Sequence, residues 1–160
     1  MKKLLIALLI ASSLTMTVNA QSDVPEDTYL SEEIQEYCEE IGEMYSICPE
    51  LLMAIIETES AGVADAENGN CKGLCQVSDK WHKERMEKLG VDDLFESYGN
   101  ILVATDYLSE LAKNYVDIGL VLHLYNGDSR AWKFAESGEL SNYAEKILNR
   151  SAELERLHGK

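Results

Sequence analysis

Basic residues are scarce in this chain. Fourteen lysines and arginines stand against 29 aspartates and glutamates, which gives the 160 residues a formal net charge of −15. Nucleic acids and anionic membrane surfaces bind basic proteins, so this balance argues against both as partners. Long apolar runs are scarce as well. Beyond the N-terminal segment, no stretch is long and apolar enough to suggest a bilayer span.

Metal-binding patterns, internal repeats and low-complexity segments are also lacking. The three histidines, His82, His123 and His158, are scattered, and the spacing of the four cysteines does not fit a zinc site. We therefore expect no metal and no cofactor. With 46% hydrophobic and 27% charged residues, the composition suits one globular domain with one core, which we expect to be a monomer.

The N-terminal segment has the pattern of a secretory signal peptide. Two lysines precede an apolar run at residues 4–11, and a small-x-small site ends at Ala20. We expect cleavage after that residue, which places the mature protein in the cell envelope or outside the cell. Residues 21–29 are polar and acidic and are predicted to form a flexible lead-in, and residues 30–160 to form the folded domain.

Four cysteines lie in the part that would be exported. An even number of cysteines outside the cytosol indicates disulfides, and four cysteines allow three pairings. We favour Cys38–Cys48 and Cys71–Cys75, because each bond would join neighbouring short elements.

The chain is predicted to be α-dominated. A turn signal at residues 68–70 and an extended segment at 73–77 predict one short, irregular hairpin. Helical periodicity and capping residues predict helices elsewhere. These predicted helices span residues 31–44, 48–62, 78–90, 97–115, 117–124, 129–136 and 142–157.

The helix predicted at residues 48–62 carries an acid at the end of its apolar face. Leu52, Ile55, Ile56 and Glu59 follow one another at i, i+3, i+4 and i+7, so they share one side of the helix. Burial raises the pKa of a carboxyl group, which suits a general acid near neutral pH. The alternative is that Glu59 reaches water or a lysine at the helix end. Glu57 points about 200° away, where we expect no such burial.

Each further candidate residue has an ordinary structural interpretation beside the functional one. The YNG sequence at 125–127 is usually a turn, and Tyr143 would suit a half-buried core position. Gln76 could lie on the surface, and Ser60 could bond locally to its own helix. Trp81 and Trp132 would suit the core as well as they would suit stacking on sugar rings.

Four segments taken together carry a resemblance to a known family. They are Glu59-Ser60, residues 73–76 (GLCQ), residues 125–127 (YNG) and Tyr143. In order and spacing they resemble the soluble lytic transglycosylase domain of the lysozyme-like superfamily, whose pattern runs E-S, G-L-M-Q, A-Y-N-G and a tyrosine in the final helix. The resemblance extends over about residues 45–150 and implies an α+β lysozyme-like fold.

Two positions depart from the family pattern. Cys75 stands where the family usually has methionine, and Leu124 where it often has alanine. The resemblance implies that in relatives this methionine forms a pocket wall that packs on sugar. The shorter cysteine would make the pocket wider at this point, or would hold the wall in place if it forms a disulfide. Neither change touches Glu59.

The resemblance implies cleavage of the β-1,4 bond between N-acetylmuramic acid and N-acetylglucosamine in peptidoglycan. Glu59 would protonate the departing oxygen and then act as a base on the sugar's own 6-hydroxyl, closing a 1,6-anhydro ring. The substrate's N-acetyl group would stabilise the cation, so no second carboxylate is needed. The implied substrate-positioning residues are Ser60, Gln76, Tyr125, Asn126 and Tyr143.

Two alternatives stay open at this stage. A hydrolytic muramidase of goose-lysozyme type would need a second carboxylate, for which Asp65 or Glu67 is the candidate. A non-catalytic glycan-binding or assembly protein would keep the fold without the reaction, although the intact Glu59 argues against it. The small size hints at recruitment by a partner, such as a secretion or conjugation apparatus.

Overall fold

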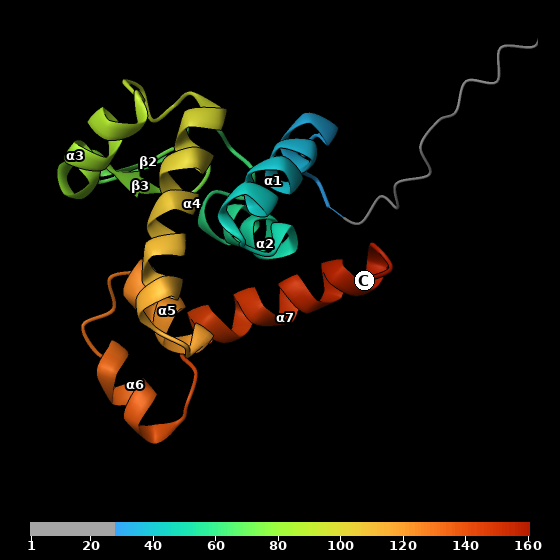
Figure 1. The fold of residues 1–160 in the computed structure, drawn as a ribbon, viewed down its shortest axis with the longest axis vertical. Coiled ribbons are helices and arrows are strands. Elements are labelled where there is room, and N and C mark those ends of the chain that lie inside the picture. The colour runs from blue at the N-terminus through green and yellow to red at the C-terminus, as the bar shows by residue number, and fades with distance from the viewer. Residues whose placement is uncertain (1–27) are drawn as a thin grey trace, which may run out of the picture.

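The computed structural model describes residues 28–160, which form seven helices and a small three-stranded sheet (Figure 1). The predicted signal peptide, residues 1–20, lies outside the described residues, as does most of the predicted lead-in. These seven helices and the small sheet confirm the predicted α-dominated architecture. None of the helices in the described part is long and apolar enough to cross a membrane. The helices are α1 (Glu32–Tyr45), α2 (Pro49–Glu59), α3 (Asp79–Leu89), α4 (Ser97–Asn114), α5 (Ile118–Tyr125), α6 (Ala131–Ser137) and α7 (Asn142–Leu157).

Helix α2 is buried along most of its length. Pro49 occupies its first turn, where a missing N–H breaks no helical bond, and the seven residues from Glu50 to Ile56 are all buried. It packs against α7 on one side and α1 on the other, as Figure 1 shows. The helix ends at Glu59, earlier than predicted, because Ala61 and Gly62 both take positive φ angles, of 53° and 76°.

The predicted hairpin is present and gains a third strand. Strands β1 (Glu67–Asn68), β2 (Cys71–Lys72) and β3 (Val77–Ser78) pair antiparallel in the order β1-β2-β3. The chain turns between β2 and β3 at Gly73, whose φ is 72°. A Cβ atom there would lie 2.2 Å from the carbonyl oxygen of Leu94, so this close approach requires glycine.

The remaining helices are connected through α4 and α5. Helix α4 packs against α1, α3 and α5, and α5 also contacts α6 and α7. The core is continuous across these contacts, from Cys38 of α1 through Ile101 and Leu108 of α4 to Ile147 of α7. The far end of the predicted lead-in packs onto α2, because Tyr29 donates a hydrogen bond to the carbonyl oxygen of Glu57.

Two ion clusters, each built around a buried carboxylate, attach α7 and the C-terminal residues to α2. Glu57 forms a two-point ion pair with Arg150, with N–O distances of 2.6 and 3.0 Å, and its side chain is 8% exposed. The expectation that Glu57 escapes burial is therefore wrong, because α7 covers that face of α2. Glu50 is fully buried at the start of α2, where Lys160 Nζ and His158 Nδ1 lie 2.7 and 2.9 Å from its carboxylate.

The predicted disulfides are not present. All four cysteines are free in the described part of the chain, which includes every cysteine of the sequence. The pairs chosen by sequence proximity lie in different surroundings, since Cys38 is buried in the core while Cys48 is exposed and donates to Glu50. Cys75 is likewise buried, whereas Cys71 is partly exposed. Nearness in sequence did not place either pair in a common environment.

Candidate active site

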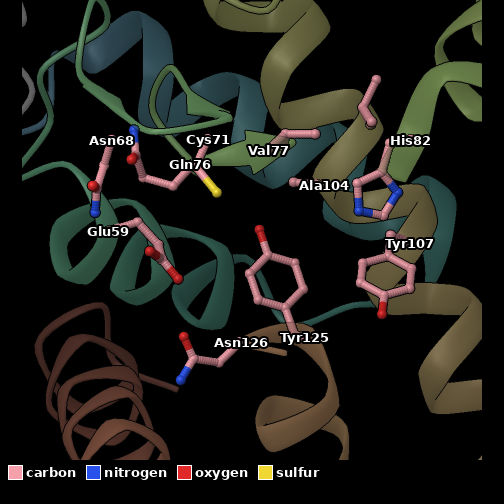
Figure 2. Close-up of a pocket in the computed structure, with 11 residues that line it drawn as sticks. Glu59, Asn68, Cys71, Gln76, Val77, His82, Ala104, Tyr107, Tyr125 and Asn126 are labelled. Carbon is pink, nitrogen blue, oxygen red and sulfur yellow. The ribbon is translucent and has the colours of Figure 1, made fainter. Parts of the chain in front are cut away.

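Glu59 lies at the C-terminal end of α2 and lines a cavity of about 190 Å³ (Figure 2). The residues that line this cavity come from α2, the small sheet, α3, α4 and the end of α5. Figure 2 shows the Glu59 carboxylate and the Tyr125 ring approaching the same space from opposite helices. The lining residues are Glu59, Asn68, Cys71, Gln76, Val77, His82, Val103, Ala104, Tyr107, Tyr125 and Asn126.

The surroundings of Glu59 favour its protonated form. Burial raises the pKa of this carboxyl group, and the opposing effects of a hydrogen bond from Tyr143 and the charge of Lys146 do not cancel the rise. Glu59 is also the last residue of α2, where the negative end of the helix dipole disfavours a second negative charge. A proton is therefore retained to higher pH than on an ordinary glutamate.

Tyr143 holds the acid in place from the first turn of α7. Its hydroxyl donates to Glu59 Oε1 at 2.5 Å, across the interface between α7 and α2. Burial, with the nearby charge of Glu59, raises the pKa of Tyr143, so the phenol stays a donor. The bond fixes one carboxyl oxygen and leaves the other free to face a ligand.

The loop at residues 73–76 is built around Asn100 of α4. The Asn100 side chain is fully buried; its Nδ2 donates to the carbonyl oxygens of Lys72 and Leu94, both at 2.8 Å, and its Oδ1 accepts from the Cys75 N–H at 2.8 Å. Each polar atom of the amide is used, as burial requires. Asn100 therefore ties the loop that carries Gln76 to the long helix α4.

Gln76 lines the cavity in a constrained conformation. Its φ is 48°, and its Nε2 donates to the carbonyl oxygens of Ala66 and Gly73 at 3.1 and 3.0 Å. Because these two bonds use both amide hydrogens, the side-chain carbonyl is the group left for a ligand. A strained backbone held by its own side chain is typical of a functional loop.

Tyr125 and Asn126 close the cavity from the end of α5. The Tyr125 hydroxyl donates to the carbonyl oxygen of Cys75 at 3.0 Å, and the ring stacks on Tyr107 with centroids 5.8 Å apart. Burial raises the pKa of Tyr125 well above its usual range. Asn126 is exposed beside it at the C-cap of α5.

Comparison with known proteins identifies the family. Residues 36–146 match the model of the transglycosylase SLT domain. The chain belongs to this family. Among solved structures, an inactive glutamate-to-glutamine mutant of lytic transglycosylase Slt from Pseudomonas aeruginosa matches with a TM-score of 0.67 and 19% identity, covering 78% of this chain and 24% of that one. The chain thus spans about a quarter of that protein, and the likeness shows a shared lysozyme-like fold. No curated protein matches this chain.

Ser60 is one predicted site residue of this SLT-family chain that the structure does not bring into the cavity. It is buried, and its hydroxyl donates to the carbonyl oxygen of Ile56 at 3.2 Å. This is the local bond to the preceding turn that the sequence left open as an alternative. Glu59, Gln76, Tyr125 and Asn126 line the cavity together, and Tyr143 reaches it through Glu59.

Several residues of the site were missed by sequence reasoning. His82, Tyr107 and Cys71 line the cavity, and Asn100 organises its loop, yet the sequence assigned none of them to the site. Asn100 and Tyr107 do lie in a segment, residues 100–111, that resembles the family's helix between the second and third motifs, and this was the one signal available for them. Asp65 and Glu67, the candidates for a second carboxylate, are exposed and are not among the lining residues. Within residues 28–160 no three His, Cys, Asp or Glu side chains are grouped so that they could hold a metal ion.

Proposed function

We propose that this chain is a lytic transglycosylase that cleaves the β-1,4 bond between N-acetylmuramic acid and N-acetylglucosamine in peptidoglycan. The observation that carries the proposal is the cavity's single acid: among its described lining residues, Glu59 is the one carboxyl group, and burial raises its pKa. Membership of the transglycosylase SLT domain family supports a glycan-cleaving enzyme. In the Pseudomonas protein a glutamate-to-glutamine mutant is inactive, and we assign the essential glutamate here to Glu59.

In the first step Glu59 acts as a general acid. Its raised pKa keeps the proton available, and Tyr143 holds one carboxyl oxygen in position. Glu59 gives the proton to the glycosidic oxygen while the bond from that oxygen to the anomeric carbon breaks. The N-acetyl group of the substrate stabilises the positive charge that develops on the sugar.

In the second step the same residue acts as a general base. The Glu59 carboxylate takes the proton of the muramic acid 6-hydroxyl, whose oxygen forms a bond to the anomeric carbon. This closes the 1,6-anhydro ring and returns the proton to Glu59, so no water is consumed. The Gln76 carbonyl and the Asn126 amide would hold acetamido or hydroxyl groups of the sugar, and Tyr125 forms a wall.

The hydrolytic alternative lacks support from the described residues. An inverting hydrolase holds its water on a second carboxylate, about 6.5–9.5 Å from the acid. Asp65 and Glu67 are exposed outside the cavity lining, and the Glu57 carboxylate is taken up by Arg150. A single buried acid suits the ring-closing reaction better.

The test is to digest purified peptidoglycan with the protein and analyse the released muropeptides by mass spectrometry. We expect products lighter by one water than reducing-end muropeptides, and a loss of about 10³-fold or more for Glu59→Gln. Glu67→Gln, an exposed glutamate, is the matched control and should release the same products as the wild type. Reducing ends would show a hydrolase, and glycan binding without release, unchanged in Glu59→Gln, would show a binding protein.

A location in the cell envelope or outside the cell follows from this substrate, and we propose it with the signal peptide expected at residues 1–20. Fractionation of cells should recover the protein beginning after Ala20. Recovery of the uncleaved chain in the cytosol would contradict this proposal without bearing on the chemistry of Glu59.

A further inference from the structure

Two larger hollows lie beside the cavity that holds Glu59, and His82 lines all three. The second hollow has a volume of about 580 Å³ and the third about 340 Å³, and Trp81, His82 and Arg85 line both. His82 also lines the cavity with Glu59, so the three spaces lie next to one another around its side chain. Hollowed surface is therefore present along α3, beyond the cavity that Glu59 lines.

Helix α3 is kinked at the residues that line these hollows. The backbone of His82 has φ −113° and ψ 16°, which is not helical and kinks α3 in its first turns. Trp81 and His82, which lie next to each other at this kink, line the same two hollows.

The His82 ring is fixed by a row of aromatic side chains that leads back toward Glu59. It lies 4.6 Å from the Tyr107 ring, which stacks on Tyr125. Arg85 lies over Tyr107 at 5.2 Å and is held by Asp106 and Glu110. Burial, with the charge of Arg85, lowers the pKa of His82, so its neutral ring offers one donor and one acceptor.

Trp81 is the exposed end of this arrangement. Its side chain is 76% exposed, although tryptophan is the residue whose burial would stabilise the fold most. Lys80 Nζ lies 5.1 Å from its ring centroid, and an ammonium group covers at most one face of an indole. A large aromatic face is thus left open at the edge of a groove.

We propose that Trp81 and His82 form a stacking platform for a sugar ring of the glycan strand, remote from the bond that Glu59 cleaves. The apolar face of a pyranose would lie on the indole, and a sugar hydroxyl would bond to the imidazole. The inference rests on the proposed function, since it assigns a second contact to the same substrate. It makes Trp81 a residue that selects long strands over short ones.

The sequence contains two tryptophans, which permits a direct test. In Glu59→Gln protein carrying Trp132→Phe, Trp81 is the single tryptophan and its fluorescence reports on its surroundings. We expect peptide-free peptidoglycan glycan strands to change this fluorescence. The mirror variant, Glu59→Gln with Trp81→Phe, keeps Trp132, which lies on α6 against Tyr115 and outside these hollows. Its fluorescence should not change.

Affinity provides the second measurement. By calorimetry with the Glu59→Gln protein, Trp81→Ala should weaken binding of long glycan strands by about tenfold and of disaccharides little. Trp132→Ala should leave both affinities unchanged. Thermal unfolding of each variant separates a loss of contact from a loss of fold, and Trp81→Tyr should restore part of the affinity.

The outcomes separate this inference from the proposed function. Glycan binding with unchanged Trp81 fluorescence and no effect of Trp81→Ala would overturn the platform and leave the role of Glu59 intact. A Trp81 response to free stem peptides, with none to peptide-free glycan, would also overturn it. Absence of any glycan binding by the Glu59→Gln protein would overturn both.

Discussion

Tyr143 donates a 2.5 Å hydrogen bond to Glu59, and this bond joins the first turn of α7 to the last residue of α2. The two residues are 84 positions apart in the chain, and they meet because α7 packs along α2. Burial and this hydrogen bond act on the acid in opposite directions, since burial raises its pKa and the bond lowers it. Burial prevails.

Removing the Tyr143 hydroxyl should raise the pKa of Glu59 further. The bond stabilises the ionised carboxylate, so Tyr143→Phe favours the protonated form. Because the proposed first step needs the protonated acid, the alkaline limb of the kcat/KM profile should move to higher pH. The measurement is the pH dependence of muropeptide release.

Tyr125→Phe is the matched control for this shift. Its hydroxyl donates to the Cys75 backbone rather than to Glu59, so the alkaline limb should stay in place even if the overall rate falls. A limb that moves to lower pH in Tyr143→Phe, or moves equally in both variants, would contradict the assigned role of Tyr143.

Two glutamates that are two positions apart should give opposite results. Glu59→Gln should abolish release and leave the free energy of unfolding close to that of the wild type. Glu57→Gln should keep its activity within about twofold and lose about 2 kcal/mol of stability, because it breaks a largely buried ion pair with Arg150. Denaturant unfolding and a release assay measure the two effects. Loss of activity in folded Glu57→Gln protein would contradict this division.

Asn100→Asp should disrupt the loop at residues 73–76. Aspartate keeps the acceptor for the Cys75 N–H but turns a carboxylate oxygen toward the carbonyls of Lys72 and Leu94. We expect a loss of about 3 kcal/mol in the free energy of unfolding, together with a strong loss of activity. Ser109→Ala, which removes one partly buried hydrogen bond from the same helix, should cost about 1 kcal/mol.

The buried carboxylate of Glu50 should make stability depend on acid pH. Burial alone would raise its pKa, but hydrogen bonds from Lys160, His158 and Cys48 outweigh burial and lower the pKa from 4.5 to about 2. A depressed pKa contributes stability above the unfolded value, and this contribution disappears as the pH falls from about 4.5 through about 2.

Glu50→Gln tests this directly. The variant should lose about 2 kcal/mol at neutral pH, and its difference from the wild type should shrink below pH 4.5. Glu36→Gln, an exposed position on α1, should show no such difference. A gap between Glu50→Gln and the wild type that is the same at every pH would count against the ion cluster.

Much of the site was predictable because its signals are local. The spacing of Leu52, Ile55, Ile56 and Glu59 depends on the helical period alone, and the structure has the buried helix and an acid at its end. The motifs around Gln76 and Tyr125 likewise occupy short segments, and both residues line the cavity with Glu59. Glu57 shows the limit, because helical geometry gives its direction but not the α7 arginine that meets it.

By itself the sequence determined the helices, the small hairpin, the family and the acid, since periodicity, capping residues and motif order act between near neighbours. Only the tertiary structure decided which polar groups meet across the fold. In the tertiary structure the cysteines are unpaired, and the Ser60 hydroxyl bonds to its own helix. Asn100 makes three hydrogen bonds, and Trp81 is exposed beside the groove. Those outcomes depend on contacts between residues distant in the chain, which no local pattern encodes.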